Sequence, residues 1–528
     1  MENTAKYIQS GQAVLGIEFG STRIKAVLIN QQGEILATGI ADWENHFDNG
    51  IWTYSKAEIW QGLQQSYADL TQQVQDKYQV TLTQLAAIGI SAMMHGYLPF
   101  DKQDNLLVPF RTWRNNFTQK SSQKLTALFN HNIPQRWSIS HLYQAILNNE
   151  PHVAQIDYFT TLAGYVHWQL TGEKVLGIGD ASGMFPIDSE RLDYDQTMLQ
   201  QFDELISEKH YPWHIKALLP KVLLAGENAG FLSEKGAKLL DPAGNLQANI
   251  PFCPPEGDAG TGMVATNSIK EKTGNISAGT SAFAMIVLEK ALSKVYPELD
   301  IVTTPMGKLV AMAHANNCSS EINAWVHLFN EVLQTFDVNV NSQTLYETLF
   351  NQALKGSSDC GGLLAYGFHS GEHIMGLGSG CPMFMHPTQS EFNLANFMLS
   401  HLYAAFGAMK LGVDILLQQE KVNIEQVLAH GGMFKTQGIA QKILASALNI
   451  PVATMQTAGE GGAWGIALLA NFLGKNSSLS EYLDHEIFTQ SERQLIHPDE
   501  DIHQGYEKFI KQYQQGIAIV QTAIEHIK

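Results

Sequence analysis

Apolar and polar positions alternate over short distances at the start of the chain. Apolar runs rich in β-branched residues occur at 14–19, 23–29 and 35–41, separated by small or polar residues. Only Gly20-Ser21-Thr22 lies between the first two runs. Short apolar runs with tight connections are typical of antiparallel strands. The pattern therefore predicts a meander of three strands over residues 14–41.

A second pattern follows, which indicates helices that alternate with strands. Residues 56–79 have helical spacing, with one apolar face made by Ile59, Leu63, Tyr67, Leu70 and Val74. The apolar run at 85–94 predicts a buried strand, and 165–174 predicts a helix that Gly172 ends. Strands mixed with helices in this way favour an α/β layer architecture.

The opening pattern returns halfway along the chain. Residues 273–288 contain a strand-like run, a turn of small residues and a second strand-like run, as residues 14–29 do. Both segments place Gly beside Ser and Thr between the apolar runs. We interpret this as an internal repeat. The predicted parts are an N-terminal domain (1–268), a C-terminal domain (269–475) and a helical extension (476–528) that contains a helix over 504–527.

Length and composition narrow the classes of function. At about 150 residues per domain, the 528 residues allow two to four domains. Hydrophobic residues make up 45% of the chain and charged residues 16%, which suits large folded cores. The formal net charge of −18 gives no general attraction to phosphate backbones or anionic lipid. We therefore expect neither a nucleic-acid partner nor a membrane partner.

The expected compartment is the cytoplasm. The first 12 residues are polar and lack the apolar core of a signal peptide. No run approaches the ~18 apolar residues of a membrane span. The chain has four cysteines, none in CxxC spacing, which suits free thiols in a reducing compartment. The sequence also contains no zinc motif.

Two turns of small residues are the first candidates for chemistry. Gly20-Ser21-Thr22 and Gly279-Thr280-Ser281 lie between strand-like runs, where backbone N–H groups and hydroxyls can approach a polyphosphate closely. An ordinary hairpin turn is the alternative for each. Glu18, two residues before the first turn, is a candidate for holding Mg²⁺ through water, with a solvated strand-end charge as the alternative. Lys25 on the facing strand is a candidate partner for Glu18.

A carboxylate and two glycine clusters complete the candidates. Asp258 lies in the turn-like segment PPEGDAGTGM (254–263), where an accessible carboxylate can accept a hydroxyl proton during phosphoryl transfer. Turn chemistry alone is its alternative. Gly431-Gly432 and Gly459-Glu460-Gly461-Gly462 each precede a helix-like stretch. Helix N-termini favour phosphate, and close helix packing is the other reason for such glycines.

Taken in order, these segments resemble the FGGY carbohydrate kinases. The resemblance runs from about 13 to 471 and includes both turns, the Gly257-Asp258 segment and GEGGAWGIALLA at 459–470. That family transfers the γ-phosphate of ATP to a sugar or polyol hydroxyl. Its fold has two actin-like (ribonuclease-H-like) domains on either side of a central cleft. The resemblance therefore implies an α/β fold of this kind, with ATP and Mg²⁺ as cofactors.

The resemblance also assigns roles to single residues. Asp258 falls on the family's catalytic base, and Glu18 falls on the carboxylate at the metal. The residues implied in ATP binding are Gly20, Ser21, Thr22, Lys25, Gly279, Thr280, Ser281, Gly431, Gly432, Phe434, Gly459, Glu460 and Gly461. The residues implied in sugar binding are Met94, His95, Gly96, Trp113, Asn115 and Asp258.

Within the family the chain is most similar to xylulokinases. SAMMHGYLPFD (91–101) and LTGEKVLGIGDASGMFPID (170–188) resemble their sugar-side segments. The chain departs from the family in its first carboxylate, Glu18 in place of Asp, and in W-R-N-N-F (113–117), where Asn115 and Phe117 replace Asp and Arg. The family's G-E-R becomes Gly371-Glu372-His373.

These observations predict a kinase that phosphorylates a ketopentose resembling xylulose or ribulose, with another ketose or a polyol as the alternative substrate. An actin-like ATPase that binds proteins is a rival from another class, and a sugar-binding protein without catalysis is a second rival. The intact Asp258 argues against the second rival. The expected partners are a small sugar and ATP, and the sequence leaves a homodimer open.

Overall fold

The chain divides into two compact units in the computed structural model, which describes residues 2–436, 438–455, 461–489 and 493–527. The first unit contains Met1–Ile269, Ile301–Val310 and Glu460–Gln490. The second unit contains Lys270–Asp300, Ala311–Gly459 and Ser491–Lys528. This division differs from the predicted domains, because residues 461–489 return to the first unit and residues 493–527 belong to the second.

Each unit is built around one main sheet. In the first unit its strands are β1 (Val14–Phe19), β2 (Arg23–Ile29), β3 (Ile35–Asp42), β6 (Ala87–Ala92) and β13 (Glu256–Gly257). In the second sheet they are β14 (Thr273–Ala278), β15 (Ala282–Val287), β16 (Leu299–Thr303), β17 (Leu309–Ala315), β20 (Gln426–His430), β21 (Val452–Met455) and β22 (Arg493–Ile496). Short strand pairs outside these sheets are β4 (His46–Asp48), β5 (Ile51–Thr53), β7 (Leu98–Phe100), β8 (Tyr158–Thr160), β9 (Val175–Gly177), β10 (Ile187–Asp188), β11 (Asp193–Tyr194), β12 (Lys221–Leu223), β18 (Leu364–Tyr366) and β19 (Met383–Met385).

The helices are divided between the two units. Those of the first unit are α1 (Glu2–Gln9), α2 (Lys56–Tyr78), α3 (Gln119–Phe129), α4 (Ser138–Leu147), α5 (Leu162–Thr171), α6 (Ile178–Ala181), α7 (Gln196–Leu205), α8 (Ile215–Leu218), α9 (Glu234–Leu240), α10 (Asp258–Ala265), α15 (Gly461–Asn471) and α16 (Leu479–Tyr482). Those of the second unit are α11 (Ser320–Thr335), α12 (Ser342–Ala353), α13 (Leu394–Asp414), α14 (Ile439–Leu448) and α17 (Glu500–His526).

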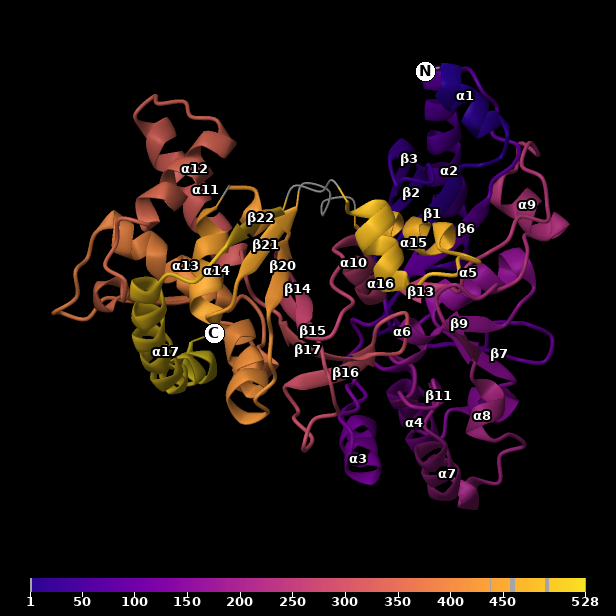
Figure 1. Cartoon of the computed structure of the whole chain (residues 1–528). Helices are drawn as coiled ribbons and strands as arrows, with labels where there is room; N and C mark the ends of the chain where they lie inside the picture. Colours follow the sequence, from indigo (N-terminus) through magenta and orange to yellow (C-terminus); the bar gives the residue numbers. More distant parts are fainter. Residues whose placement is uncertain (1, 437, 456–460, 490–492, 528) are drawn as a thin grey trace. The chain divides into compact units, whose positions relative to one another are not determined.

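The first sheet confirms the predicted meander. Its strand order is β13-β6-β1-β2-β3, with β1-β2 and β2-β3 antiparallel. Strands β6 and β13 add to the other side of β1 in parallel. The helix predicted at 56–79 is α2, which packs on β2 and β3, and α15 packs on β1 and β6 (Figure 1).

Two glycines allow these helices to lie close to the sheet. A Cβ on Gly16 in β1 would lie 2.2 Å from the carbonyl oxygen of Ala463 in α15. A Cβ on Gly39 in β3 would lie 2.0 Å from the carbonyl oxygen of Ser66 in α2. Because no side chain fits in either place, these positions fix how near α15 and α2 approach the strands that carry the candidate site.

The second sheet repeats the topology of the first. Its strand order is β16-β17-β15-β14-β20-β21-β22. Strands β14 and β15 form an antiparallel hairpin, and β20 and β21 extend the sheet in parallel from β14. The order β17-β15-β14-β20-β21 thus matches β3-β2-β1-β6-β13, and the repeat inferred from residues 14–29 and 273–288 is confirmed as a repeat of strand order.

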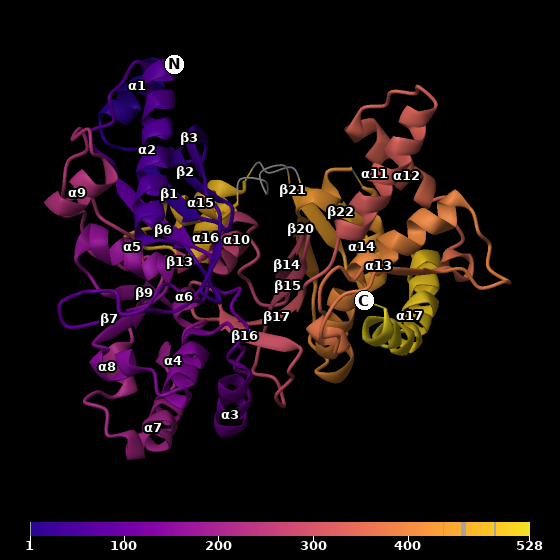
Figure 2. The same cartoon turned by 180° about the vertical axis from the view of Figure 1, so that it is seen from behind.

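The C-terminal helix is part of the second unit's core. The helix predicted at 504–527 is α17, and it packs on α13 and α14 (Figure 2). Its buried side chains include Tyr506, Phe509 and Tyr513. Tyr506 donates a hydrogen bond to the carbonyl oxygen of Tyr403 in α13 (2.9 Å). A helix anchored in this way is a component of the second unit and not a separate extension.

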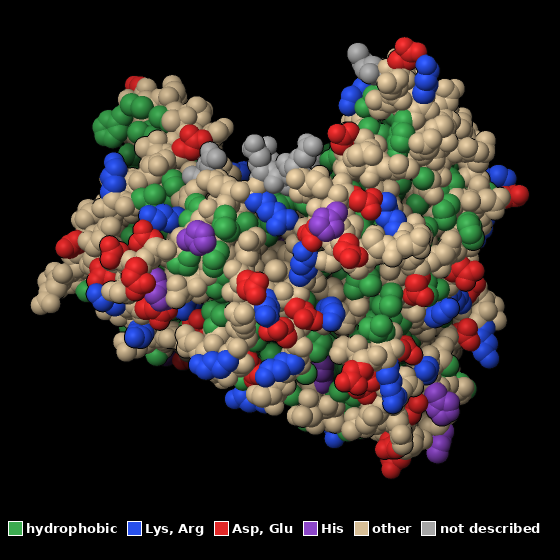
Figure 3. Space-filling view, viewed as in Figure 1, with side chains coloured by type: hydrophobic (Ala, Val, Ile, Leu, Met, Phe, Trp, Pro, Cys, Tyr) green, Lys and Arg blue, Asp and Glu red, His purple; other side chains and the backbone are tan. Residues whose placement is uncertain are grey.

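The surface matches the acidic composition. Figure 3 shows Lys and Arg side chains scattered among Asp and Glu side chains on the displayed face. Among the residues that the structure describes, no helix combines the length and the apolar character that crossing a bilayer requires.

Candidate active site

The candidate residues of the first unit gather at one edge of its sheet. In the strand register Glu18 of β1 lies opposite Ser91 of β6, and Ser91 lies opposite Glu256 of β13. These strands are parallel, so their carboxyl ends share one edge. The segments that follow them are Gly20–Thr22, Met94–Gly96 and the start of α10 at Asp258. The carboxyl edge of parallel strands is where α/β sheets bind ligands.

The turn after β1 is held from one side by two aromatic residues. The indole N–H of Trp43 donates to the carbonyl oxygen of Gly20 (2.7 Å), and the hydroxyl of Tyr54 donates to that of Ser21 (2.6 Å). The two rings stack, with centroids 4.0 Å apart. In a trans peptide the C=O and the next N–H point in opposite directions. The N–H groups of Ser21 and Thr22 therefore point away from the aromatic pair, as phosphate binding requires.

Glu18 is enclosed at this edge and is not a solvated strand-end charge. Its Oε2 accepts a hydrogen bond from the N–H of Ala463 in the first turn of α15 (3.1 Å). Lys25 lies directly opposite Glu18 in the β1–β2 register. Burial, and after it the charge of Asp258, raises the pKa of Glu18 to about 7.

The negative charge around Glu18 suits a magnesium site. Burial also raises the pKa of Asp258, so both groups lie where a cation would stabilise their ionised forms. Among the described residues no group of three His, Cys, Asp or Glu side chains could hold a metal. Mg²⁺ typically uses one or two carboxylates, with substrate phosphates and water completing its shell. Glu18 suits that kind of site, with the charge of Asp258 nearby.

Asp258 is the first residue of α10, whereas the sequence predicted a turn. Gly257 before it has an extended backbone and caps the helix, which continues to Ala265. The Oδ1 atom of Asp258 accepts a hydrogen bond from the N–H of Met94 (3.1 Å). The side chain is half-buried. This contact joins Asp258 to the Met94–Gly96 segment and leaves the carboxylate accessible.

A second pair of carboxylates, which sequence reasoning did not single out, lies behind Asp258. The two oxygens of Glu256 accept the N–H groups of Gly179 (3.2 Å) and Asp180 (2.9 Å). Asp180 accepts the hydroxyl of Thr161 on Oδ2 (2.6 Å), while its buried Oδ1 has no hydrogen-bond partner among the described residues. Burial raises the pKa of both carboxylates. The sequence offered one signal, the GDASG segment that contains Asp180.

His95 and Gly96 shape the loop after β6. Both have left-handed backbones, with φ of 69° and 100°. The buried ring of His95 places Nδ1 3.2 Å from the carbonyl oxygen of Gly183 and stacks against Trp137 at a centroid distance of 6.3 Å. A Cβ on Gly183 would lie 2.7 Å from this nitrogen. The segments at 94–97 and 179–183, predicted to lie on the sugar side, are therefore in contact.

Asn115 has a different environment from the one its predicted role implies. Its Nδ2 donates to the carbonyl oxygens of Trp52 (2.8 Å) and Thr112 (2.9 Å), and its Oδ1 accepts the N–H of Trp52 (2.9 Å). These backbone contacts use both amide hydrogens and fasten β5 to the 112–115 loop. These bonds give Asn115 a scaffold role, and its part in sugar binding stays a prediction. Trp113 is half-buried and packs against the core.

A buried arginine near Asn115 was also missed by sequence reasoning. Arg111 bridges to Tyr97 through the backbone and forms an ion pair with Glu150. Its Nε and Nη1 atoms have no hydrogen-bond partner among the described residues. Its guanidinium lies 5.4 Å from the ring centroid of Tyr97. Nothing in the local sequence distinguishes this arginine from an exposed one.

In the second unit two predicted nucleotide segments are neighbours. Strands β14 and β20 pair in parallel and end in the turn at 279–281 and in Gly431-Gly432. Gly431 has φ of 107°, and a Cβ there would lie 2.4 Å from the carbonyl oxygen of Ala278. Phe434 follows and stacks on Phe406, with centroids 6.3 Å apart.

Of the remaining glycine cluster, Gly461 belongs to the first unit. Gly459 and Glu460 lie outside the described residues. Gly461 begins α15 in the first unit, where a Cβ would lie 3.6 Å from Oε2 of Glu18. The structure thus places Gly461 beside the Glu18 carboxylate of the first unit, whereas Gly431 and Gly432 belong to the second.

Comparisons with known proteins agree with this architecture. Residues 13–265 and 274–473 match the N-terminal and C-terminal domains of the FGGY family of carbohydrate kinases. Xylulose kinase of Haemophilus influenzae is 23% identical over 94% of this chain and 98% of its own. The match to xylulose kinase of Escherichia coli is 25% identical but spans 53% of this chain and only 55% of that protein.

Solved structures are similar over nearly the whole chain. A xylulose kinase and a gluconate kinase from Lactobacillus acidophilus superpose with TM-scores of 0.77 and 0.78 at 18% identity. Each comparison covers 98% of this chain and 99% of the other. At this identity the likeness concerns the fold, and it does not distinguish between the substrates of the two kinases.

Proposed function

The chain belongs to the FGGY family of carbohydrate kinases, and we propose that it transfers the γ-phosphate of ATP to a hydroxyl of a ketopentose resembling xylulose or ribulose. The observation that carries this proposal is the grouping of Gly20–Thr22, Met94–Gly96 and Asp258 at one sheet edge. A phosphate turn, a sugar-side loop and an accessible carboxylate are the parts that this reaction needs.

Asp258 is the general base in this proposal. A sugar hydroxyl gives its proton to the Asp258 carboxylate while its oxygen forms a bond to the γ-phosphorus. The bond between the γ-phosphorus and the bridging oxygen breaks, and ADP leaves with the electron pair. The Met94 N–H that bonds Oδ1 holds the carboxylate in a fixed orientation during this transfer.

The turns supply donors for the phosphates. The outward N–H groups of Ser21 and Thr22 bind phosphate oxygens in the first unit, and Gly279–Ser281 does so in the second. Gly431, Gly432 and Phe434 are assigned to the adenosine side. Glu18 would hold Mg²⁺, which would supply positive charge to neutralise the phosphates.

The proposed partners follow from the same chemistry. They are ATP and a small sugar, and no nucleic acid or membrane is proposed, in keeping with the net charge of −18. The cytoplasm is the proposed location because both substrates are metabolites. The proposal is compatible with a homodimer.

The second candidate function is phosphorylation of an acceptor other than a ketopentose, and one specific observation favours it. Asn115 and Phe117 replace the Asp and Arg of the family pattern, and the Asn115 amide is occupied by the backbone of Trp52 and Thr112. The pattern of hydroxyl recognition therefore differs from that of typical xylulokinases. A polyol or a sugar acid is the alternative acceptor, in line with the glycerol kinase and gluconokinase names among similar proteins.

ADP release measured by a coupled assay tests both candidates. The panel contains ketopentoses, ketohexoses, glycerol and gluconate, each with ATP and Mg²⁺. The proposal predicts that a ketopentose gives the highest kcat/KM, well above the rate without sugar. A preference for glycerol or gluconate would refute the ketopentose as the substrate and would still support the kinase activity. ATP hydrolysis that no sugar stimulates would favour an actin-like ATPase, and sugar binding without ADP release would favour a binding protein.

A further inference from the structure

The turn at 279–281 is anchored by backbone donors from the loop after β17. The N–H of Cys318 donates to the carbonyl oxygen of Thr280 (2.9 Å), and the N–H of Ser319 donates to that of Gly279 (3.0 Å). Because C=O and N–H oppose each other across a trans peptide, these contacts direct the N–H groups of Thr280 and Ser281 away from the loop. Residues 318–319 thus set the direction of the turn's phosphate donors.

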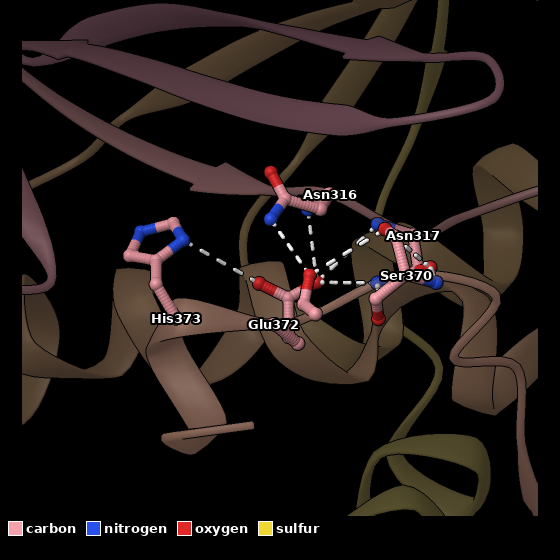
Figure 4. A network of polar contacts seen from close by, with 6 residues as sticks. Asn316, Asn317, Ser370, Glu372 and His373 are labelled. Atoms are coloured by element: carbon pink, nitrogen blue, oxygen red, sulfur yellow. Dashed lines mark hydrogen bonds and ion pairs between the residues drawn. The ribbon is translucent and has the colours of Figure 1, made fainter. Parts of the chain in front are cut away.

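The residues just before this anchor are held by one buried carboxylate. Oε2 of Glu372 accepts the backbone N–H of Asn316 (2.8 Å), the backbone N–H of Asn317 (3.3 Å) and Nδ2 of Asn317 (3.1 Å). Figure 4 shows these bonds converging on Glu372, with His373 on the other side. The Glu372 side chain is fully buried. A carboxylate that accepts several N–H groups forms stronger hydrogen bonds than a neutral acceptor does.

Further bonds join the same two segments. Oδ1 of Asn317 accepts the N–H groups of His369 (2.9 Å) and Ser370 (3.0 Å), and Nδ2 of Asn316 donates to the carbonyl oxygen of Gly371 (2.7 Å). Residues 316–317 and 369–372 therefore form one polar block. Residues 318–319, whose N–H groups bond to the turn, follow directly after this block.

We infer that Glu372 is a positioning residue for the nucleotide: it orients the phosphate donors of the 279–281 turn through Asn316–Ser319. The inference rests on the proposed function, because it assumes that this turn binds ATP phosphates. Glu372 itself bonds to the loop and not to the turn. Its loss is expected to weaken ATP binding more than sugar binding.

Glu372→Gln tests the inference, since the amide keeps the size and one acceptor but removes the charge. We expect the dissociation constant and the KM for ATP with Mg²⁺ to rise about fivefold to tenfold, while the KM for the sugar stays within twofold. A purely structural role would reduce the active fraction, which lowers kcat and leaves both KM values unchanged. A melting curve accompanies each titration.

Glu420→Gln is the matched control. Glu420 also accepts hydrogen bonds in the second unit, from the N–H (2.9 Å) and hydroxyl (2.5 Å) of Ser293 and from the hydroxyl of Tyr296 (2.7 Å), and none of these bonds involves 316–319 or the turn. Its variant should bind ATP as the wild type does. Equal ATP affinity in the wild type and Glu372→Gln, or equal losses in both variants, overturns the inference.

Two further measurements make every outcome decisive. Wild-type protein is titrated with ATP first, because a wild type that does not bind ATP would refute the proposed function. If the wild type binds ATP and Glu372→Gln binds it equally well, only the role of Glu372 is refuted. If Glu372→Gln does not fold, Asn316→Ala decides the question. It removes the bond to Gly371 and keeps the carboxylate, so ATP affinity should fall about twofold to fivefold. Unchanged affinity in Asn316→Ala would overturn the inference.

Discussion

Replacement of Asp258 by Asn separates the chemistry of this residue from its place in the fold. The amide is close in size to the carboxylate, and its oxygen can still accept the N–H of Met94 that now bonds Oδ1 at 3.1 Å. The charge of Asp258 is one of the causes that raise the pKa of Glu18 to about 7. Removing that charge relieves its repulsion of the Glu18 carboxylate, so the variant should melt at the wild-type temperature or slightly above it.

The loss of rate follows from the lost proton acceptor. A positioned general base contributes about 10²–10⁴-fold, and at about 1.4 kcal/mol per factor of ten this corresponds to roughly 3–5 kcal/mol of transition-state stabilisation. Asn cannot accept the hydroxyl proton, so kcat should fall by this factor. Binding should change little because the remaining contacts are kept. The KM values for ATP and sugar should therefore stay close to those of the wild type.

Sugar-dependent ADP release, a melting curve and an ATP titration check this prediction. Glu256→Gln serves as the control, since Glu256 lies two residues before Asp258 and uses both oxygens for the N–H groups of Gly179 and Asp180. It should lower the melting temperature and leave kcat within a few-fold. Near-normal kcat in Asp258→Asn would refute the assignment, and unfolding of that variant would show that Asp258 serves the start of α10.

Further predictions concern a metal, a scaffold contact and pH. Glu18→Gln should raise the Mg²⁺ concentration for half-maximal rate about 10- to 100-fold, and an unchanged Mg²⁺ titration would contradict its role. Asn115→Ala should lower the free energy of unfolding in urea by about 1–3 kcal/mol, whereas Ala at exposed Asn116 should not. Burial raises the pKa of Glu372 from 4.5 to about 7, so the folded state binds this proton more tightly. Its contribution to stability is then present at low pH and lost between about pH 4.5 and 7, by about 3 kcal/mol. Urea unfolding at pH 5 and pH 8 should show a smaller difference in Glu372→Gln than in the wild type.

Much of the fold was predictable because its signals are local. The strands at 14–19 and 23–29 have only three residues between them, and the helix at 56–79 has a regular apolar face. Elements of this kind can be recognised without knowledge of distant segments, because a strand pair with a tight turn can close on itself. The family resemblance then supplied the two-domain architecture, which the matches at 13–265 and 274–473 confirm.

The helical start at Asp258 could not be predicted from local signals. Its segment contains three glycines between 257 and 262, and glycine disfavours helices by about 1 kcal/mol per residue. Packing decides the outcome, because α10 contacts α15 so closely that a Cβ on Gly465 would lie 2.0 Å from the carbonyl oxygen of Thr261. Small residues that are unfavourable in an isolated helix are required in this pair.

Long-range partners explain the other differences. The amide of Asn115 bonds to Trp52, 63 residues earlier in the chain, and no spacing rule connects the two. Gly461 belongs to the first unit because the chain returns there after β21. A glycine cluster that precedes a helix gives no information about which sheet that helix covers. A motif that carries its own geometry can therefore be interpreted from the sequence, whereas a contact that a distant backbone segment supplies cannot. The roles of the site residues stay predictions.

The internal repeat shows how one geometric requirement can be met by unrelated side chains. In both turns the carbonyl oxygens must accept hydrogen bonds from the supporting residues, so that the following N–H groups point in the opposite direction. In the first unit the donors are the indole of Trp43 and the hydroxyl of Tyr54. In the second they are the backbone N–H groups of Cys318 and Ser319, next to the block held by Glu372. Any donor at the right position satisfies a carbonyl, so strand order can repeat between the units while the supporting residues differ.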